Sequence, residues 1–324
     1  MHRRQAVTWE THEVAQRVEA VVLGGRAPGL HGLVVIKGGE IIYERYGSGE
    51  DFTWNESVGV VEFGPDTLHD IRSVTKSVTG LVYGIALGKG LVPEPQESLL
   101  GQFPEYPDLA REKAGLTIEH AMTMTLGLEW NEDVPYTSTD NSELAMEAAD
   151  DRYRYILERP IVEEPGRTWR YCGGAAALIG RIIAKGAGVP LDAFAREHLL
   201  EPLGITASEW MAGDDGDPSA ASGLRLTARG LAEIGQLVLD GGRGIVPSEW
   251  IDRMLTPRVG DYGYQWYVGT GDTRWYGAFG NGGQRVYVEP GRDLVFAITA
   301  GDYNDSDQPA ANAVHEAIGA ALVK

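Results

Sequence analysis

Residues 71–90 read IRSVTKSVTGLVYGIALGKG, and this stretch decides how the rest of the chain is interpreted. Apolar side chains recur along it at the spacing of one helix face, and a Gly-Lys-Gly segment closes it. The pattern predicts a helix that begins near Ser73. Ser73 and Lys76 would then lie about one helical turn apart, so that the lysine amine can lie beside the serine hydroxyl.

A Ser-x-x-Lys pair at a helix start suits nucleophilic catalysis. A serine hydroxyl is a poor nucleophile unless a neighbouring base takes its proton, and a lysine can do so if burial or nearby positive potential lowers its pKa. The helix N-terminus supplies such a potential, and the backbone N–H of Ser73 can stabilise an oxyanion. Serine is also an ordinary residue near a helix start, so the motif alone is equally compatible with a structural role.

Two later segments contain further candidate catalytic groups. In PGRTWRYCGG, residues 165–174, Tyr171 precedes a helix rich in Gly and Ala, and a phenol near an ammonium group can serve as a general base. In GNGGQRVYVEP, residues 280–290, glycines lead into a strand and allow a ligand to approach an edge N–H. The structural alternatives are a half-buried tyrosine and a simple hairpin turn.

The remaining periodicity predicts one sheet made from both chain ends. Residues 11–23 have the pattern of an amphipathic helix, and residues 32–46 that of a hairpin around Gly38-Gly39. Helical patterns dominate from about 90 to 255. Strand patterns return after residue 260, before a closing helix.

This order of elements predicts an α+β fold, an antiparallel sheet flanked by helices. We expect residues 1–88 and 256–324 to form the sheet subdomain. Residues 89–255 are expected to form an inserted, mainly helical subdomain.

Composition excludes several classes of partner. The 324 residues hold 28 Lys and Arg against 47 Asp and Glu, a net charge of −19, which is the wrong sign for binding nucleic acid or anionic lipid. We find neither a signal peptide nor a run of about eighteen apolar residues, so a cytoplasmic location is expected. Cys172 is the only cysteine, so no internal disulfide can form. The seven histidines show no metal-ligand spacing, and no metal site is expected.

Taken in order, these blocks resemble the serine hydrolases of the class C β-lactamase and penicillin-binding-protein-like family. This family includes the D,D-peptidases and the family VIII carboxylesterases. The similarity covers most of the chain, from the hairpin through IRSVTKSVTG, LTIEHAMTMTLGL and PGRTWRYCGG to GNGGQRVYVEP. It is greatest to the 6-aminohexanoate-dimer hydrolase branch, through WNED at 130–133, Tyr171-Cys172 and the Gly-Gly-Gln that ends at 284. The resemblance implies a β-lactamase/transpeptidase-like fold.

The resemblance also implies roles for individual residues. Ser73 would be the nucleophile that forms an acyl-enzyme, with Lys76 and Tyr171 sharing proton transfer. The oxyanion would be held by the N–H groups of Ser73 and Gln284. The candidate substrate-binding turn before Gln284 is formed by Asn281, Gly282 and Gly283. No metal and no organic cofactor is expected.

Three departures from the family pattern bear on the substrate. Gly173 stands where β-lactamases have Asn, Asn281 stands where the third motif commonly has Lys, and residues 124–127 read MTLG where HTSG is frequent. A cation that would face a substrate carboxylate is therefore absent. Residues 129–164 also hold eleven acids against three arginines, and we expect them to form an acidic rim of the pocket.

These features favour a serine hydrolase of the carboxylesterase or amidase type. Its expected substrate is a small ester or amide, neutral or cationic. A β-lactamase or D,D-peptidase-type hydrolase is an alternative, and a hydrolase-like binding module without turnover is another. The sequence makes no prediction about the oligomeric state.

Overall fold

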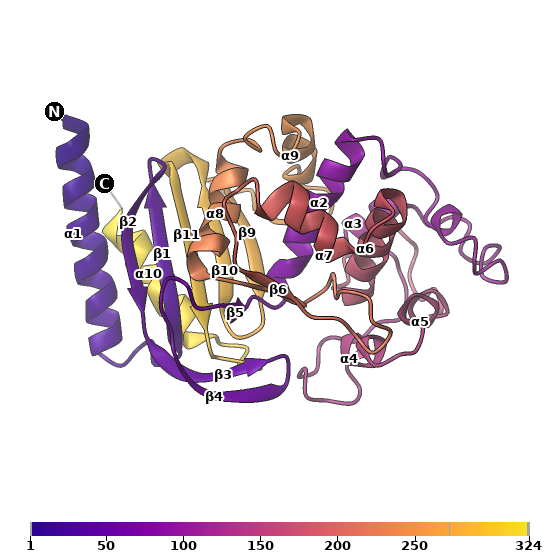
Figure 1. Cartoon of the computed structure of the whole chain (residues 1–324), viewed down its shortest axis with the longest axis horizontal. Coiled ribbons are helices and arrows are strands. Elements are labelled where there is room, and N and C mark those ends of the chain that lie inside the picture. The colour runs from indigo at the N-terminus through magenta and orange to yellow at the C-terminus, as the bar shows by residue number, and fades with distance from the viewer. Residues whose placement is uncertain (1, 272, 323–324) are drawn as a thin grey trace. The chain divides into compact units, whose positions relative to one another are not determined.

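The computed structural model describes residues 2–271 and 273–322 (Figure 1). The chain divides into two compact units. The first, called here the sheet unit, comprises Met1–Val74, Arg225–Asp240 and Gly271–Lys324. The second, the helical unit, comprises Thr75–Leu224 and Gly241–Thr270.

The sheet unit contains five antiparallel strands from both ends of the chain, in the order β2-β1-β11-β10-β9. They are β1 (Leu30–Lys37), β2 (Glu40–Tyr46), β9 (Trp275–Gly280), β10 (Gln284–Glu289) and β11 (Leu294–Ala300). The predicted hairpin is confirmed, since β1 pairs with β2. Its turn needs glycine, because Gly38 and Gly39 have φ of 61° and 79°. The expected antiparallel sheet from both chain ends is therefore present.

Helices cover both faces of this sheet, which explains why β1 is buried up to its last residue and β11 along its whole length. On one face α1 (His2–Leu23) and α10 (Pro309–Ala321) lie side by side, as Figure 1 shows. On the other face α8 (Ala228–Leu239) packs against β1, β10 and β11. The buried side chains on the α1 and α10 face include Val14, Val18, Val21, Leu33, Val35, Phe296, Ile298, Val314 and Ile318.

Helix α8 lies within residues 89–255, the segment expected to form the helical insertion, yet it belongs to the sheet unit. Its N-cap is Thr227, whose side chain accepts a hydrogen bond from the backbone N–H of Gly230. Its apolar face fits the sheet closely at Gly235, where an added Cβ would lie 2.6 Å from Val295 Cγ1. The smaller strands of the sheet unit are β3 (Ser48–Thr53), β4 (Glu56–Glu62) and β5 (His69–Asp70), the last paired with β7 (Leu224–Leu226).

The helical unit is built around α2 and α6. Helix α2 (Val74–Gly88) starts at the residue after Ser73, as predicted. Helix α6 (Gly173–Ala187) is buried over most of its length. The other elements are η1 (Leu100–Gln102), α3 (Ile118–Met122), α4 (Ser142–Glu147), α5 (Arg152–Leu157), α7 (Leu191–Ala195), η2 (Arg196–Leu200), β6 (Ser208–Trp210), α9 (Ser248–Met254) and β8 (Tyr267–Gly269).

One stretch whose periodicity is that of a single helix, residues 142–158, is interrupted in the structure. The pattern SELAMEAADDRYRYILE forms two helices, α4 and α5, because the side chain of Asp151 accepts a hydrogen bond from Arg154 N–H and starts a new helix.

No single helix within the described ranges has the length and apolar composition to cross a bilayer. Only α6 together with Leu191–Leu200 meets that test, as a pair bent by 76°.

Candidate active site

Lys76 is the third residue of α2, and its side chain is only 2% exposed. The Nζ group donates to Oε2 of Glu143 and to the backbone oxygen of Ala221, each at 3.0 Å. It also lies 4.9 Å from the centre of the Tyr171 ring. The structure therefore brings together two of the residues predicted to share proton transfer, Lys76 and Tyr171, and adds a carboxylate that the sequence did not indicate.

Glu143 occupies the space that the family pattern assigns to an asparagine side chain. It lies in the first turn of α4, whose N-cap Asn141 accepts hydrogen bonds from the N–H groups of Glu143 and Leu144. A Cβ added at Gly173 would overlap the Glu143 carboxylate. Glycine at position 173 is therefore what allows Glu143 to approach Lys76.

A second carboxylate, that of Glu132, lies beside this pair. It accepts hydrogen bonds from Trp130 Nε1 and from the Tyr136 hydroxyl, each at 2.6 Å, and from the backbone N–H of Gly173. Burial, and then the neighbouring Glu143 charge, raise the pKa of Glu132 to about 7. Two carboxylates that share one lysine cannot both ionise easily, so Glu132 is the member that takes up a proton.

The surroundings of Lys76 favour its charged form. Burial by itself lowers the pKa of Lys76, but the carboxylate of Glu143, followed by Tyr171 and Glu132, raises it well above its ordinary value. Burial likewise disfavours ionised Glu143, yet the Lys76 ammonium holds the pKa of Glu143 below its usual value. The lowered pKa that would let Lys76 act as the base is therefore not favoured, because nearby negative charge outweighs burial and the helix potential.

Aromatic rings surround Tyr171 within the helical unit. The ring centre of Trp169 lies 6.0 Å from that of Tyr171 and 5.6 Å from that of Tyr262. Tyr262 and Tyr267 are 4.9 Å apart, edge to face. Burial raises the pKa of both phenols, so they stay neutral. Tyr171 itself is partly exposed and Trp169 is 36% exposed.

Ser73 and the predicted oxyanion donor Gln284 both belong to the sheet unit. Ser73 is 8% exposed and directly precedes α2. Gly280, the last residue of β9, lies close both to Arg72, which precedes Ser73, and to Gln284. A Cβ added there would lie 3.0 Å from Arg72 Cβ and 3.1 Å from Gln284 Cβ. The absence of a side chain at residue 280 thus lets the turn before Ser73 approach the start of β10.

The glycine turn before Gln284 has the conformation that the sequence suggested. Gly282 and Gly283 have φ of 91° and 88°, which other residues rarely adopt. The side chain of Gln284 holds this turn, donating to the backbone oxygen of Ala300 at 2.6 Å and accepting from its N–H at 3.1 Å. Asn281 accepts from the N–H of Asn304 at 2.8 Å, so its amide serves the loop rather than standing in for the family's lysine.

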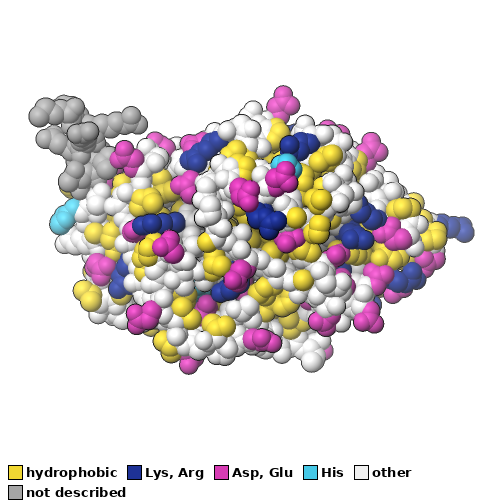
Figure 2. Space-filling view, viewed as in Figure 1, with side chains coloured by type: hydrophobic (Ala, Val, Ile, Leu, Met, Phe, Trp, Pro, Cys, Tyr) yellow, Lys and Arg dark blue, Asp and Glu magenta, His cyan; other side chains and the backbone are white. Residues whose placement is uncertain are grey.

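The acidic stretch 129–164 is only partly a surface feature. Glu143 is 2% exposed and Glu147 is 8% exposed, and Glu147 forms an ion pair with buried Arg152 at 3.0 Å. On the face drawn in Figure 2, acidic side chains are interspersed with basic ones. The expectation of an acidic rim is therefore modified, because part of this charge lies inside the helical unit, next to Lys76.

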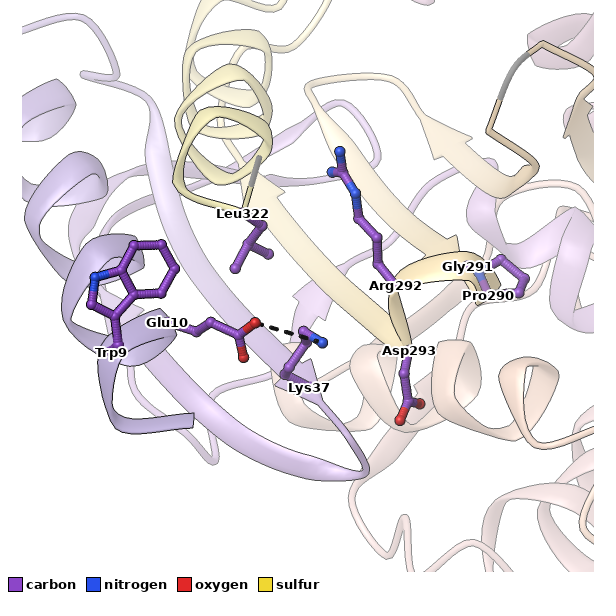
Figure 3. Close-up of a pocket in the computed structure, with 8 residues that line it drawn as sticks. All are labelled: Trp9, Glu10, Lys37, Pro290, Gly291, Arg292, Asp293 and Leu322. Atoms are coloured by element: carbon purple, nitrogen blue, oxygen red, sulfur yellow. Dashed lines mark ion pairs between the residues drawn. The ribbon is translucent and has the colours of Figure 1, made fainter. Parts of the chain in front are cut away.

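The sheet unit has a separate hollow of about 560 Å³, shown in Figure 3. Its lining includes Trp9 and Glu10 of α1, Lys37 of β1 and Arg292. Lys37 Nζ lies 3.9 Å from Glu10 Oε1, a weak ion pair between two residues of its lining. None of the predicted site residues lines this hollow, and we do not assign the chemistry to it.

Comparison with known proteins gives the family and the fold of the chain. The sequence model of the family described as Beta-lactamase matches residues 14–319. The 6-aminohexanoate-dimer hydrolase of Paenarthrobacter ureafaciens is 23% identical over 294 residues, which cover 81% of this chain and 70% of the relative.

Two solved structures share the fold. The first is EstCE1, described as a hydrolase with promiscuous acyltransferase activity. It has a TM-score of 0.77 at 14% identity, covering 95% of this chain and 99% of the other. The second is the octameric penicillin-binding protein homologue of Pyrococcus abyssi. It has a TM-score of 0.72 at 19% identity, covering 95% of this chain and 77% of the other.

The raised pKa of Glu132 predicts how stability responds to substitution at that position. Its pKa in the folded protein, about 7, exceeds the ordinary value of 4.5, so the folded state binds the extra proton and loses stability as pH rises from 4.5 through 7. Glu132→Gln should therefore improve the free energy of unfolding, relative to the wild type, more at pH 8 than at pH 5. Urea unfolding at both pH values measures this difference. Asp133→Asn, an exposed neighbour, is the control, and an effect of Glu132→Gln that is equal at both pH values would contradict the assignment.

Proposed function

This chain belongs to the beta-lactamase family, and from that membership we propose that it is a serine hydrolase that cleaves a small ester or amide through an acyl-enzyme on Ser73. The observation that carries the proposal is the buried ammonium of Lys76, held by Glu143 beside Tyr171 on the helix that Ser73 precedes. The names of the relatives, an amide hydrolase and a hydrolase with acyltransferase activity, support the same chemistry.

In the proposed mechanism Tyr171, rather than Lys76, receives the proton of Ser73. The Ser73 Oγ attacks the carbonyl carbon while its proton moves to the Tyr171 phenolate, whose charge the Lys76 ammonium stabilises. The N–H groups of Ser73 and Gln284 hold the oxyanion. Tyr171 then protonates the leaving group. In the second step water attacks the acyl-enzyme, again with Tyr171 as base, and Ser73 is regenerated. Neither step requires a metal ion or an organic cofactor.

We further propose that the substrate is neutral or cationic. Glu143 already neutralises Lys76, and Asn281 supplies no cation to pair with a substrate carboxylate. Glu132 adds negative charge to the same region when it ionises. β-Lactams and peptide C-termini both carry a carboxylate, so the family's best-known reactions are disfavoured here although the family relationship makes them the natural second candidate.

The first prediction concerns the nucleophile. Ser73→Ala should abolish hydrolysis of a short-chain p-nitrophenyl ester, and a fluorophosphonate should add covalently to Ser73 in the wild type, as measured by peptide mass spectrometry. Ser77→Ala is the matched control, because Ser77 lies one turn further along α2 and its hydroxyl donates to the backbone oxygen of Gln265. Full activity in Ser73→Ala would refute the proposal. Nitrocefin turnover as fast as ester turnover would instead favour a β-lactamase.

The second prediction concerns substrate charge. Cationic, neutral and anionic thioesters of equal length can be compared by the release of their thiols. We expect kcat/KM for the anionic thioester to be lower than for the neutral and cationic thioesters by roughly tenfold, equivalent to about 1.4 kcal/mol. The difference should shrink at high salt, where charges are screened. Equal kcat/KM values at low salt would remove the preference and leave the acyl-enzyme mechanism untouched.

The third prediction concerns the charge of Lys76. If the ammonium is required, its raised pKa should keep kcat/KM constant on the alkaline side to at least about pH 10. Glu143→Gln removes the main group that raises this pKa, so the alkaline loss of activity should move to lower pH. Glu129→Gln, which removes an exposed carboxylate from the same stretch, should leave the profile unchanged. Activity that rises as Lys76 deprotonates would identify the lysine as the base.

A further inference from the structure

The backbone immediately before Ser73 has an unfavourable conformation. Arg72 has φ of +50°, in the left-handed region that residues with a Cβ seldom adopt. Its N–H donates to Oδ1 of Asp70 at 2.9 Å, and its Nε lies 3.1 Å from Oδ2 of the same carboxylate. That Oδ2 also accepts from the N–H of Trp54 at 2.9 Å. Asp70 is fully buried, so its carboxylate clamps the turn from within.

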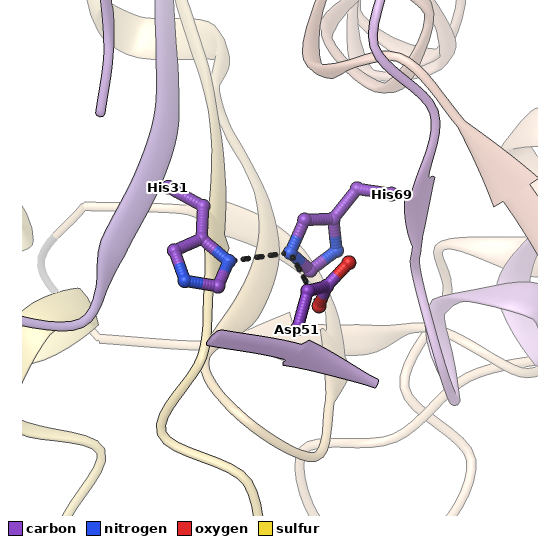
Figure 4. A group of neighbouring side chains, drawn as sticks. All are labelled: His31, Asp51 and His69. Carbon is purple, nitrogen blue, oxygen red and sulfur yellow. Dashed lines mark hydrogen bonds and ion pairs between the residues drawn. The ribbon is translucent and has the colours of Figure 1, made fainter. Parts of the chain in front are cut away.

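Two buried histidines, His31 and His69, and buried Asp51 lie next to one another, as Figure 4 shows, and His69 directly precedes Asp70. His69 Nδ1 donates to the backbone oxygen of Asp70 at 2.9 Å, which leaves Nε2 as an acceptor. His31 Nδ1 then donates to His69 Nε2, also at 2.9 Å. Asp51 Oδ1 lies 3.6 Å from the same Nε2. The carbonyl of Asp70 is thus fixed by His69, while its carboxylate fixes Arg72.

Tyr303 closes the set of contacts into a ring, in which Asp51 lies near His69 without a hydrogen bond between them. Its hydroxyl donates to Asp51 Oδ1 at 2.6 Å, and the guanidinium of Arg72 lies over its aromatic ring, 4.5 Å from the centre. A Cβ added at Gly282 would lie 2.6 Å from Tyr303 Cδ1. Tyr303 therefore contacts both the turn that presents Ser73 and the glycine turn that leads to Gln284.

A metal ion is the alternative occupant of this region, since His31, Asp51 and His69 offer three ligand atoms within 4.8 Å of one another. The two imidazole nitrogens are 2.9 Å apart, a hydrogen-bond distance. Two nitrogen ligands of a tetrahedral zinc ion with bonds of about 2.1 Å would lie roughly 3.4 Å apart. The spacing therefore favours a hydrogen bond between the two histidines over an ion site.

We propose that this ring, formed by His69, Asp70, Arg72, Tyr303 and Asp51 with His31 as its support, is a positioning network for the nucleophile. It holds the Arg72 turn in its strained conformation and so fixes the Oγ and N–H of Ser73 relative to the turn of Gln284. The inference rests on the proposed function, because it gives these residues a role only if Ser73 is acylated. Loosening the ring should slow acylation while leaving substrate affinity nearly unchanged, since none of these groups needs to touch the substrate.

Tyr303→Phe tests the network by removing one hydroxyl and keeping the ring stacked on Arg72. We expect the rate at which a fluorophosphonate labels Ser73, and kcat for ester hydrolysis, to fall by about tenfold with KM within twofold. Tyr43→Phe is the matched control, since Tyr43 also donates to a carboxylate, Glu19, at 2.8 Å, on β2 of the same unit. Its labelling rate should equal that of the wild type. Thermal unfolding of both variants shows whether they lose similar stability.

A second pair of variants keeps the test decisive if Tyr303→Phe folds poorly. Asp51→Asn retains an oxygen that can accept from Tyr303 and should keep most of the rate, whereas Asp51→Ala should lose it. Equal labelling rates in Tyr303→Phe and Tyr43→Phe would overturn the inference while the proposed function stands.

Two further outcomes would also count against the inference. Failure of wild-type Ser73 to react at all would refute the proposed function itself. Visible absorption from added Co²⁺ that disappears in His69→Gln would show a metal site in place of the positioning network.

Discussion

A buried ammonium group has to be paired, and the helical unit is arranged around that requirement at Lys76. Taking one charge out of water costs several kcal/mol, and removing one partner of a buried pair typically costs about 3–5 kcal/mol. Glu143, the backbone oxygen of Ala221 and the ring of Tyr171 together satisfy the ammonium. Three segments far apart in the chain, α2, α4 and the start of α6, must therefore meet at one point.

The pairing of Lys76 with Glu143 also determines the protonation states of the other side chains in the site. Because Glu143 stays ionised beside Lys76, the next carboxylate, Glu132, is the group whose pKa rises to about 7. The site then carries one positive charge, one negative charge and one carboxyl group that titrates near neutrality. Gly173 is the residue that makes this possible, since any side chain there would displace the Glu143 carboxylate. An asparagine at that position and a carboxylate beside the lysine are alternatives that exclude each other.

In the sheet unit the main constraint is backbone strain at Arg72 rather than buried charge. A left-handed residue with a Cβ costs roughly 1–2 kcal/mol, and such a cost persists only where the surroundings hold the conformation in place. At Arg72 this is done by contacts from Trp54, Asp70 and Tyr303, and Asp51 in turn holds the Tyr303 hydroxyl. Strain directly before a predicted nucleophile, together with a buried network that enforces it, is consistent with a turn whose geometry is under functional constraint.

Features that depend on local patterns could be predicted from the sequence alone. It predicted the hairpin of β1 and β2, the start of α2 after Ser73, the antiparallel sheet from both chain ends and, through the resemblance over many blocks, the family. It could not place α8 on the sheet or Glu143 against Lys76, because these contacts join residues far apart in the chain, 67 positions for Lys76 and Glu143, and leave no periodic trace. Only the tertiary structure decided the charge of Lys76, since a pKa depends on the sum of burial and all nearby charges, and those neighbours are chosen by the fold.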